Sequence, residues 1–202
     1  MLKTYAIAAF VAIVGLIGGT AWFAFRGDPA CGTAQVAGGA AAIGGPFTLV
    51  DETGRTVTEA DVLTKPTLVY FGYTFCPDVC PTDSARNADA LDLLQQQGYD
   101  AQAIFITVDP ERDTPEALAE FTDYMHPDML GLTGTPEQVK VATQAYKTFY
   151  SKPESDDEYY LVDHMTFTYL MLPETGFATF FKRDDSAEKI AEQAACFIDA
   201  TN

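Results

Sequence analysis

The chain has 202 residues, 48% of them apolar, and a formal net charge of −17. This length allows one membrane segment and one domain with a sizeable core, and the negative charge argues against nucleic acid as a partner. An acidic surface also attracts cationic partners or metal ions, although simple solvation explains the same charge. Four cysteines are few for a disulfide scaffold of this size, so we expect each to be individually placed.

Residues 4–25 contain no charged side chain. As a helix they would be about 33 Å long, which matches a hydrocarbon core of about 30 Å. A cleaved signal peptide is the alternative, but its apolar region is usually only about 7–15 residues long. We therefore predict that residues 1–26 form a cytoplasmic N-terminus and an uncleaved transmembrane helix. Lys3 on one side, against Arg26 offset by Asp28 on the other, favours a bacterial inner-membrane protein with its C-terminal domain in the periplasm.

Residues 27–45 contain six glycines and six alanines without hydrophobic periodicity, which predicts a flexible linker. Cys31 lies on this linker and is either a spare thiol or a disulfide partner for Cys196. The globular domain is expected to span residues 46–202.

The first half of this domain alternates between strand and helix patterns. Turn residues and β-branched runs predict a hairpin and two buried strands, and proline or capping signals open the helices. The predicted elements are a hairpin at 47–57, a helical turn at 58–63, strands at 67–71 and 103–108, and helices from Pro81 to Gly98 and from 114 to about 124.

The second half continues the alternation. A capping box at Thr135 to Gln138 opens a helix expected to reach Tyr150, and a polar, acidic excursion follows at 152–158. The remaining predicted elements are strands at 160–165, 168–172 and 177–182 and a helix at 186–198. This order predicts a single α/β domain.

Two cysteines, Cys76 and Cys80, lie between the predicted strand at 67–71 and the following helix. A helix that began at Pro77 would place Pro81 in its interior at a cost of about 3 kcal/mol, so we predict that Pro81 is its first residue. The two thiols would then lie in a loop at a helix N-terminus, where a lowered cysteine pKa is expected. Such a site suits either metal binding or thiol exchange.

Two thiolates select copper(I), zinc or iron–sulfur but do not fill a coordination sphere, so a third ligand is expected. The sequence contains two histidines. His126 follows a predicted helix and is expected to face solvent. His164 precedes the final hairpin and is the candidate ligand.

Four motifs resemble those of the Sco/SenC family of membrane-anchored copper proteins. They occur in the family's order and span most of residues 46–181: FGYTFCPDVCPT at 71–82, TVDPERDTP at 107–115, GLTGT at 131–135, and VDH at 162–164 followed by Tyr169 and Leu170.

The resemblance implies a thioredoxin-like fold in which Cys76, Cys80 and His164 hold copper(I) or copper(II). It implies delivery of copper, received from an upstream donor, to the CuA centre of cytochrome c oxidase subunit II. It also implies that Cys76 and Cys80 could act as a redox dithiol that reduces the cysteines of that centre. In this interpretation Asp163 lies next to the metal ligands and supports them without binding the metal itself. Asp78 and Pro81 shape the dithiol loop.

Other motif residues have no direct metal role in this resemblance. Asp109, Arg112 and Asp113 are expected to form a structural polar network. Met165 replaces a small hydroxyl residue and is interpreted as packing, because neighbouring strand side chains point to opposite faces. Cys31 and Cys196 lie outside the motifs.

The sequence supports two functional hypotheses. The first is a copper metallochaperone, whose affinity should rise with pH because thiol protons must leave. The alternative is a membrane-anchored thiol–disulfide oxidoreductase, so enzymatic activity stays open at this point. Against the alternative, such enzymes commonly have two residues between the cysteines and a cis-proline opposite them, whereas three residues separate Cys76 from Cys80.

Overall fold

The computed structural model describes residues 31, 42–154 and 159–201, and everything below concerns these residues. A seven-stranded sheet has the order β2-β1-β5-β4-β3-β8-β9, and β6 pairs separately with β7. The strands are β1 (Thr48–Asp51), β2 (Thr56–Thr58), β3 (Thr67–Gly72), β4 (Gln102–Thr107), β5 (Met129–Thr133), β6 (Tyr150–Ser151), β7 (Asp163–His164), β8 (Thr168–Leu172) and β9 (Gly176–Phe181). The helices are α2 (Glu59–Val62), α3 (Val79–Gln96), α4 (Pro115–Met125), α5 (Pro136–Ala145) and α6 (Ala187–Thr201).

The strand directions bring distant segments to one edge of the sheet. β3, β4 and β5 run parallel, whereas β8 is antiparallel to β3 and pairs Thr168 with Tyr70. The start of β8 therefore lies beside the end of β3. The chain that leaves β3 and the chain that enters β8 meet at the carboxyl edge of the parallel strands, where open α/β sheets commonly bind ligands.

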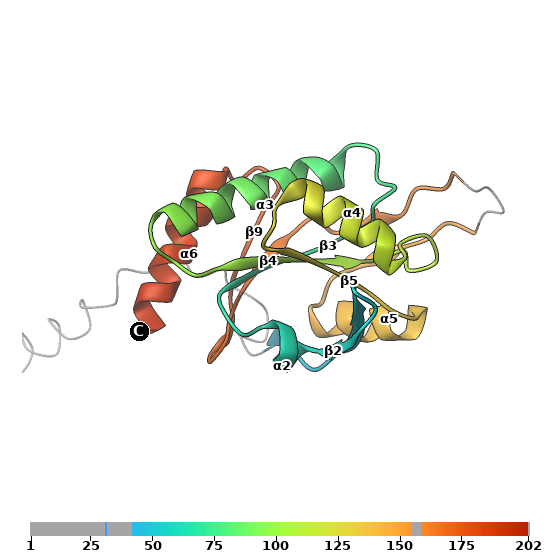
Figure 1. Cartoon of the computed structure of the whole chain (residues 1–202), viewed down its shortest axis with the longest axis horizontal. Coiled ribbons are helices and arrows are strands. Elements are labelled where there is room, and N and C mark those ends of the chain that lie inside the picture. Colours follow the sequence, from blue (N-terminus) through green and yellow to red (C-terminus); the bar gives the residue numbers. More distant parts are fainter. Residues whose placement is uncertain (1–30, 32–41, 155–158, 202) are drawn as a thin grey trace, which may run out of the picture. The chain divides into compact units, whose positions relative to one another are not determined.

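Helices cover both faces of this sheet. The β3-α3-β4 and β4-α4-β5 connections step in the same direction along the sheet, so right-handed crossovers place α3 and α4 on one face. Figure 1 shows α6 beside α3 on that face and α5 on the other. The β3-α3-β4 unit, the β8-β9 hairpin and α6 together form a thioredoxin-like α/β domain.

The core is centred on strands that are buried from both sides, as the apolar runs predicted. Every residue of β3 and β8 is buried. On one side of β3, the Phe71 ring packs 5.2 Å from Tyr146 and 6.1 Å from Tyr169, measured between centroids. This packing fixes the strand that leads into the two cysteines.

Most predicted elements are confirmed, but the end predicted for α5 is wrong. The helix ends at Ala145, because Lys147 adopts a left-handed conformation with φ of 53°. Thr148 N–H donates to Thr143 O, and Lys147 N–H donates to Gln144 O. These bonds form a Schellman cap whose left-handed position is occupied by lysine instead of the usual glycine.

Two strand predictions also differ from the structure. β5 was not predicted, and its central glycine, Gly131, hides the strand pattern. A Cβ at Gly131 would lie 2.8 Å from Leu118 Cβ, so the glycine lets α4 pack closely on β5. The strand predicted at 160–165 is limited to Asp163–His164.

The predicted membrane span and most of the predicted linker lie outside the described residues. The packed part begins before Pro46, because Ile43 is buried and Gly44 N–H donates to Ala145 O at 2.9 Å. None of the helices in the described ranges is both long and apolar enough to cross a membrane.

Candidate metal centre

The two cysteines lie on either side of the start of α3. The helix begins at Val79 after the cap residue Asp78, so the predicted start at Pro81 is two residues late. Pro81 is the third helical residue, a position whose N–H would have no partner within the helix, and it is tolerated there for that reason. Cys80 consequently lies in the first turn, and its N–H donates to Cys76 Sγ at 3.2 Å.

The structure brings the candidate ligand His164 to these cysteines. Its Nε2 lies 3.3 Å from Cys80 Sγ, and the candidate ligand atoms of Cys76, Cys80 and His164 all lie within 4.8 Å of one another. His164 Nδ1 lies 3.0 Å from the Met165 carbonyl. A proton on Nδ1 satisfies this carbonyl and leaves the Nε2 lone pair directed at the sulfur, the tautomer that a metal ligand needs.

Burial controls the protonation of this site. It raises the pKa of the Cys80 thiol, which is fully buried, and it lowers the pKa of His164. The expected lowering of the cysteine pKa is therefore wrong for Cys80, because desolvation outweighs the helix N-terminus. At neutral pH the site offers a neutral imidazole and a protonated Cys80, so a metal must displace that proton.

Gly72 allows Cys80 to sit against the end of β3. A Cβ at this position would lie 3.0 Å from Cys80 Sγ, 2.9 Å from Tyr70 and 3.0 Å from Phe105. A larger residue would have to displace the sulfur or the two rings. The glycine in the dithiol motif is thus explained by close packing.

A cavity of about 250 Å³ is lined by two of the candidate ligands, Cys76 and His164, whereas Cys80 is fully buried and does not line it. Asp78 and Asp163 line it, and both are exposed. The apolar side chains of Val79 and Leu161 form other parts of its wall. The cavity therefore combines carboxylates that attract cations with an apolar surface beside Cys76.

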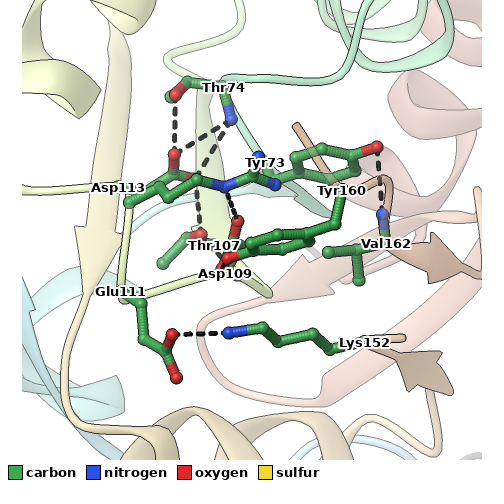
Figure 2. A network of polar contacts seen from close by, with 10 residues as sticks. Tyr73, Thr74, Thr107, Asp109, Glu111, Asp113, Lys152, Tyr160 and Val162 are labelled. Atoms are coloured by element: carbon green, nitrogen blue, oxygen red, sulfur yellow. Dashed lines mark hydrogen bonds and ion pairs between the residues drawn. The ribbon is translucent and has the colours of Figure 1, made fainter. Parts of the chain in front are cut away.

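The expected polar network of Asp109, Arg112 and Asp113 is present next to the dithiol loop (Figure 2). Asp113 accepts hydrogen bonds from Thr74 N–H at 3.0 Å, from Thr74 Oγ1 at 2.6 Å and from Thr107 Oγ1 at 2.6 Å. Burial raises the pKa of Asp113. These bonds attach the dithiol loop to the chain that follows β4.

The other histidine lies elsewhere and does not face solvent as predicted. The His126 side chain is 6% exposed, its Nδ1 accepts Asp128 N–H at 3.0 Å, and its Nε2 lies 3.3 Å from Asp92. A histidine that closes a helix C-terminus can be buried when both ring nitrogens find partners, which the local sequence does not reveal.

The four cysteines fall into two chemical classes. Cys76 and Cys80 are free, whereas Cys31 and Cys196 are each disulfide-bonded. The spare-thiol alternative for Cys31 is therefore wrong.

Sequence reasoning missed the role of Tyr73. Its hydroxyl accepts Val162 N–H at 3.2 Å, and its ring packs edge-on to His164 with 5.8 Å between centroids. Tyr73 thereby links the dithiol loop to the segment before His164. An aromatic residue after a buried strand resembles ordinary core, so its pattern gave no separate signal.

Fold and site together define a class of protein: a thioredoxin-like domain with two free thiols and one imidazole arranged for a soft metal. The SCO1/SenC family model matches residues 35–199. This chain belongs to the SCO1/SenC family.

The relatives agree with this assignment. Protein SenC of Rhodobacter capsulatus is 52% identical over 202 residues, covering 98% of this chain and 91% of SenC. The crystal structure of Arabidopsis thaliana ScoI with copper bound is 40% identical, with a TM-score of 0.75 and coverage of 79% of this chain and 99% of that one. Bradyrhizobium japonicum ScoI with copper bound is 36% identical, with a TM-score of 0.69 and coverage of 77% and 99%.

Proposed function

We propose that this protein is a copper metallochaperone that binds copper through Cys76, Cys80 and His164. The observation that carries the proposal is the convergence of two free thiols with a ring nitrogen 3.3 Å from one sulfur. Two sulfurs and one imidazole suit copper(I) in low coordination, and the imidazole also supports copper(II). Solved relatives from Arabidopsis and Bradyrhizobium have copper bound.

The proposed acceptor is the CuA centre of cytochrome c oxidase subunit II, as the family resemblance implies, and an upstream donor supplies the copper. The cavity beside Cys76 and His164 supports direct transfer, because an acceptor's thiolates could approach a metal bound there from that side. Asp78 and Asp163 line this cavity. We propose that they influence the ligands without binding the metal themselves.

We further propose that residues 1–26 anchor the protein in a bacterial inner membrane, that residues 27–45 form the linker, and that residues 46–202 carry copper in the periplasm. The charge-free run at 4–25 supports this arrangement. A reporter that is active only after export, fused behind Asn202, should be active. Activity confined to a cytoplasmic reporter, or a mature N-terminus beyond Arg26, would contradict it.

Metal analysis of the purified domain, paired with a free-thiol count, tests the proposed function. The expected result is one copper per chain with Cys76 and Cys80 reduced. Copper(I) affinity should be higher at pH 8 than at pH 6, by about tenfold per pH unit for each proton released, because burial raises the pKa of Cys80. Reduced thiols without bound copper, or an affinity that is flat with pH, would argue against the three-ligand site.

Transfer itself has a separate readout. The copper-loaded domain should lose its metal to a reduced apo fragment of subunit II, whose CuA absorption then appears. Purified protein that holds one zinc per chain instead of copper would favour another role. The same conclusion would follow if no copper moved to the fragment.

A thiol–disulfide oxidoreductase remains the second candidate, favoured by the two free thiols at the start of α3. In that reaction Cys76 and Cys80 form one disulfide and give two electrons and two protons to an acceptor disulfide, which becomes two thiols. Such exchange needs no imidazole ligand. The consequences of replacing His164 therefore separate the two candidates.

A further inference from the structure

The short strand that carries His164 has few main-chain bonds to hold it. β7 consists of Asp163–His164 and pairs only with β6, where His164 opposes Tyr150 and Asp163 opposes Ser151. His164 is half-buried. A ligand on such a segment needs further contacts to stay beside the sulfurs.

Arg112 supplies those contacts from the loop after β4. Its guanidinium carbon lies 3.6 Å from the centroid of the Tyr160 ring, a stacking distance, and its Nε donates to Asp109 Oδ2 at 2.5 Å. The Tyr160 hydroxyl donates to the other oxygen of Asp109 at 2.7 Å. Arg112, Asp109 and Tyr160 therefore form a closed cluster, which we call the arginine clasp. Figure 2 labels Asp109 and Tyr160, and Tyr160 lies four residues before His164 in the sequence.

The same guanidinium also reaches the dithiol loop. Its carbon lies 4.8 Å from the centroid of Phe75 and 5.7 Å from that of Tyr73. Phe75 immediately precedes Cys76, and Tyr73 accepts Val162 N–H. One cation thus contacts aromatic rings from both segments that carry the candidate ligands, and a partly buried cation over such rings is strongly attracted to them.

A structural role alone does not explain this position. Asp113 already attaches the dithiol loop to the chain after β4, through Thr74. The additional contacts of Arg112 run from the dithiol loop to Tyr160, on the side of His164. Their loss would loosen the segment that carries the imidazole, whereas the bonds from Thr74 to Asp113 would still hold the dithiol loop.

We propose that Arg112 is a positioning residue that, through the arginine clasp, holds His164 against Cys76 and Cys80 and so sets the affinity for copper(II). This inference rests on the proposed function, because it assigns the regulation of the same copper site. Copper(I), which two thiolates can hold, should depend on Arg112 much less. The residue acts through His164 and need not touch the metal.

A double-mutant cycle between Arg112→Met and His164→Ala tests this proposal. Arg112→Met alone should weaken copper(II) binding by about 10- to 100-fold, the usual effect of losing a group that orients a ligand. In the His164→Ala background the same change should alter copper(II) affinity by less than about twofold, since the ligand it positions is absent. Equal losses in both backgrounds, or no loss in either, would overturn the proposal.

Arg55→Met is the matched control, because Arg55 also pairs with a buried carboxylate, that of Asp51, at 2.8 Å. It removes a guanidinium from an acidic partner on the β1-β2 hairpin, away from the ligands, and should leave copper(II) affinity unchanged. A similar loss of affinity in this variant would show that general destabilisation, and not positioning, weakens the site.

Hydrogen exchange of the metal-free protein separates this inference from the proposed function. The Val162 amide should exchange faster in Arg112→Met than in the parent, while amides of β3 keep their protection. Unchanged exchange at Val162 overturns the clasp whatever the metal does. Faster exchange, combined with unchanged copper(II) binding in His164→Ala, would retain the clasp and refute the proposed ligand set.

If Arg112→Met does not fold, Tyr160→Phe carries the test. It keeps the stacked ring and removes the hydroxyl, which bonds Asp109 and also exposed Lys152. Because the bond to Lys152 is exposed, copper(II) affinity should fall by about fivefold, as for the single bond to Asp109. An affinity equal to that of the parent would overturn the proposal.

Discussion

Replacement of His164 by alanine is expected to weaken copper(II) binding by more than about 100-fold, beyond the usual cost of losing a group that only orients a ligand. The imidazole Nε2 is 3.3 Å from Cys80 Sγ and its other nitrogen is held by the Met165 carbonyl. The other histidine is held by Asp128 and Asp92, so it is no substitute. Chelator competition with copper(II), alongside a CuA assembly assay, measures the loss.

The variant should retain its dithiol chemistry. Cys76 and Cys80 would still oxidise and reduce, and copper(I) can remain on two thiolates. His126→Ala is the matched control: it removes a buried histidine with two ring contacts, so it should lower stability without changing copper binding. If folded His164→Ala binds copper(II) and assembles CuA like the parent, the oxidoreductase alternative gains.

The double variant Cys76→Ser, Cys80→Ser should lose stoichiometric copper in both oxidation states. Hydroxyl groups are hard and remain protonated at neutral pH, so they cannot replace thiolates for copper(I). The remaining imidazole is one ligand and does not hold the metal alone. Metal analysis after dialysis measures the loss, and a copper content near one per chain would refute the assignment of both cysteines.

The matched double variant Cys31→Ser, Cys196→Ser should keep its copper. Both residues are disulfide-bonded and neither belongs to the cluster of candidate ligands. Loss of a native disulfide typically costs about 2–5 kcal/mol, so the variant should unfold at a lower temperature while binding one copper per chain. Loss of half the copper or more would mean that the ligands are misassigned.

The sequence placed His164 beside the dithiol through its position in a thioredoxin-like topology, the lack of another plausible nitrogen donor and the family resemblance, and the structure brings its Nε2 to 3.3 Å from Cys80 Sγ. β3 leads into the dithiol loop, and β8 runs antiparallel beside it. The chain that enters β8 must therefore arrive at the edge of the sheet where β3 ends. The pairing of Tyr70 with Thr168 realises this arrangement. The predicted helix start failed by two residues because proline is tolerated throughout the first turn, not only at its first position.

The errors concern properties that arise from tertiary contacts. The pKa of Cys80 depends on complete burial beneath neighbouring elements, which the motif does not encode locally. The end of α5 depends on a lysine in a conformation usually taken by glycine. Likewise, the arginine clasp joins Arg112 to Tyr160 across 48 positions of sequence, and no short pattern links them.

The pairing of β8 with β3 also makes the three-donor site depend on folding, because it brings His164 to the two cysteines. Cys80 and His164 are 84 positions apart, so an unfolded chain offers copper a local pair of thiols but not the three-donor site. If the proposed ligand set is correct, copper bound by all three donors is bound to native molecules only and stabilises them by mass action. A newly made chain can form that proposed site only after β8 has docked on β3, so complete copper loading would follow the folding of this part of the sheet.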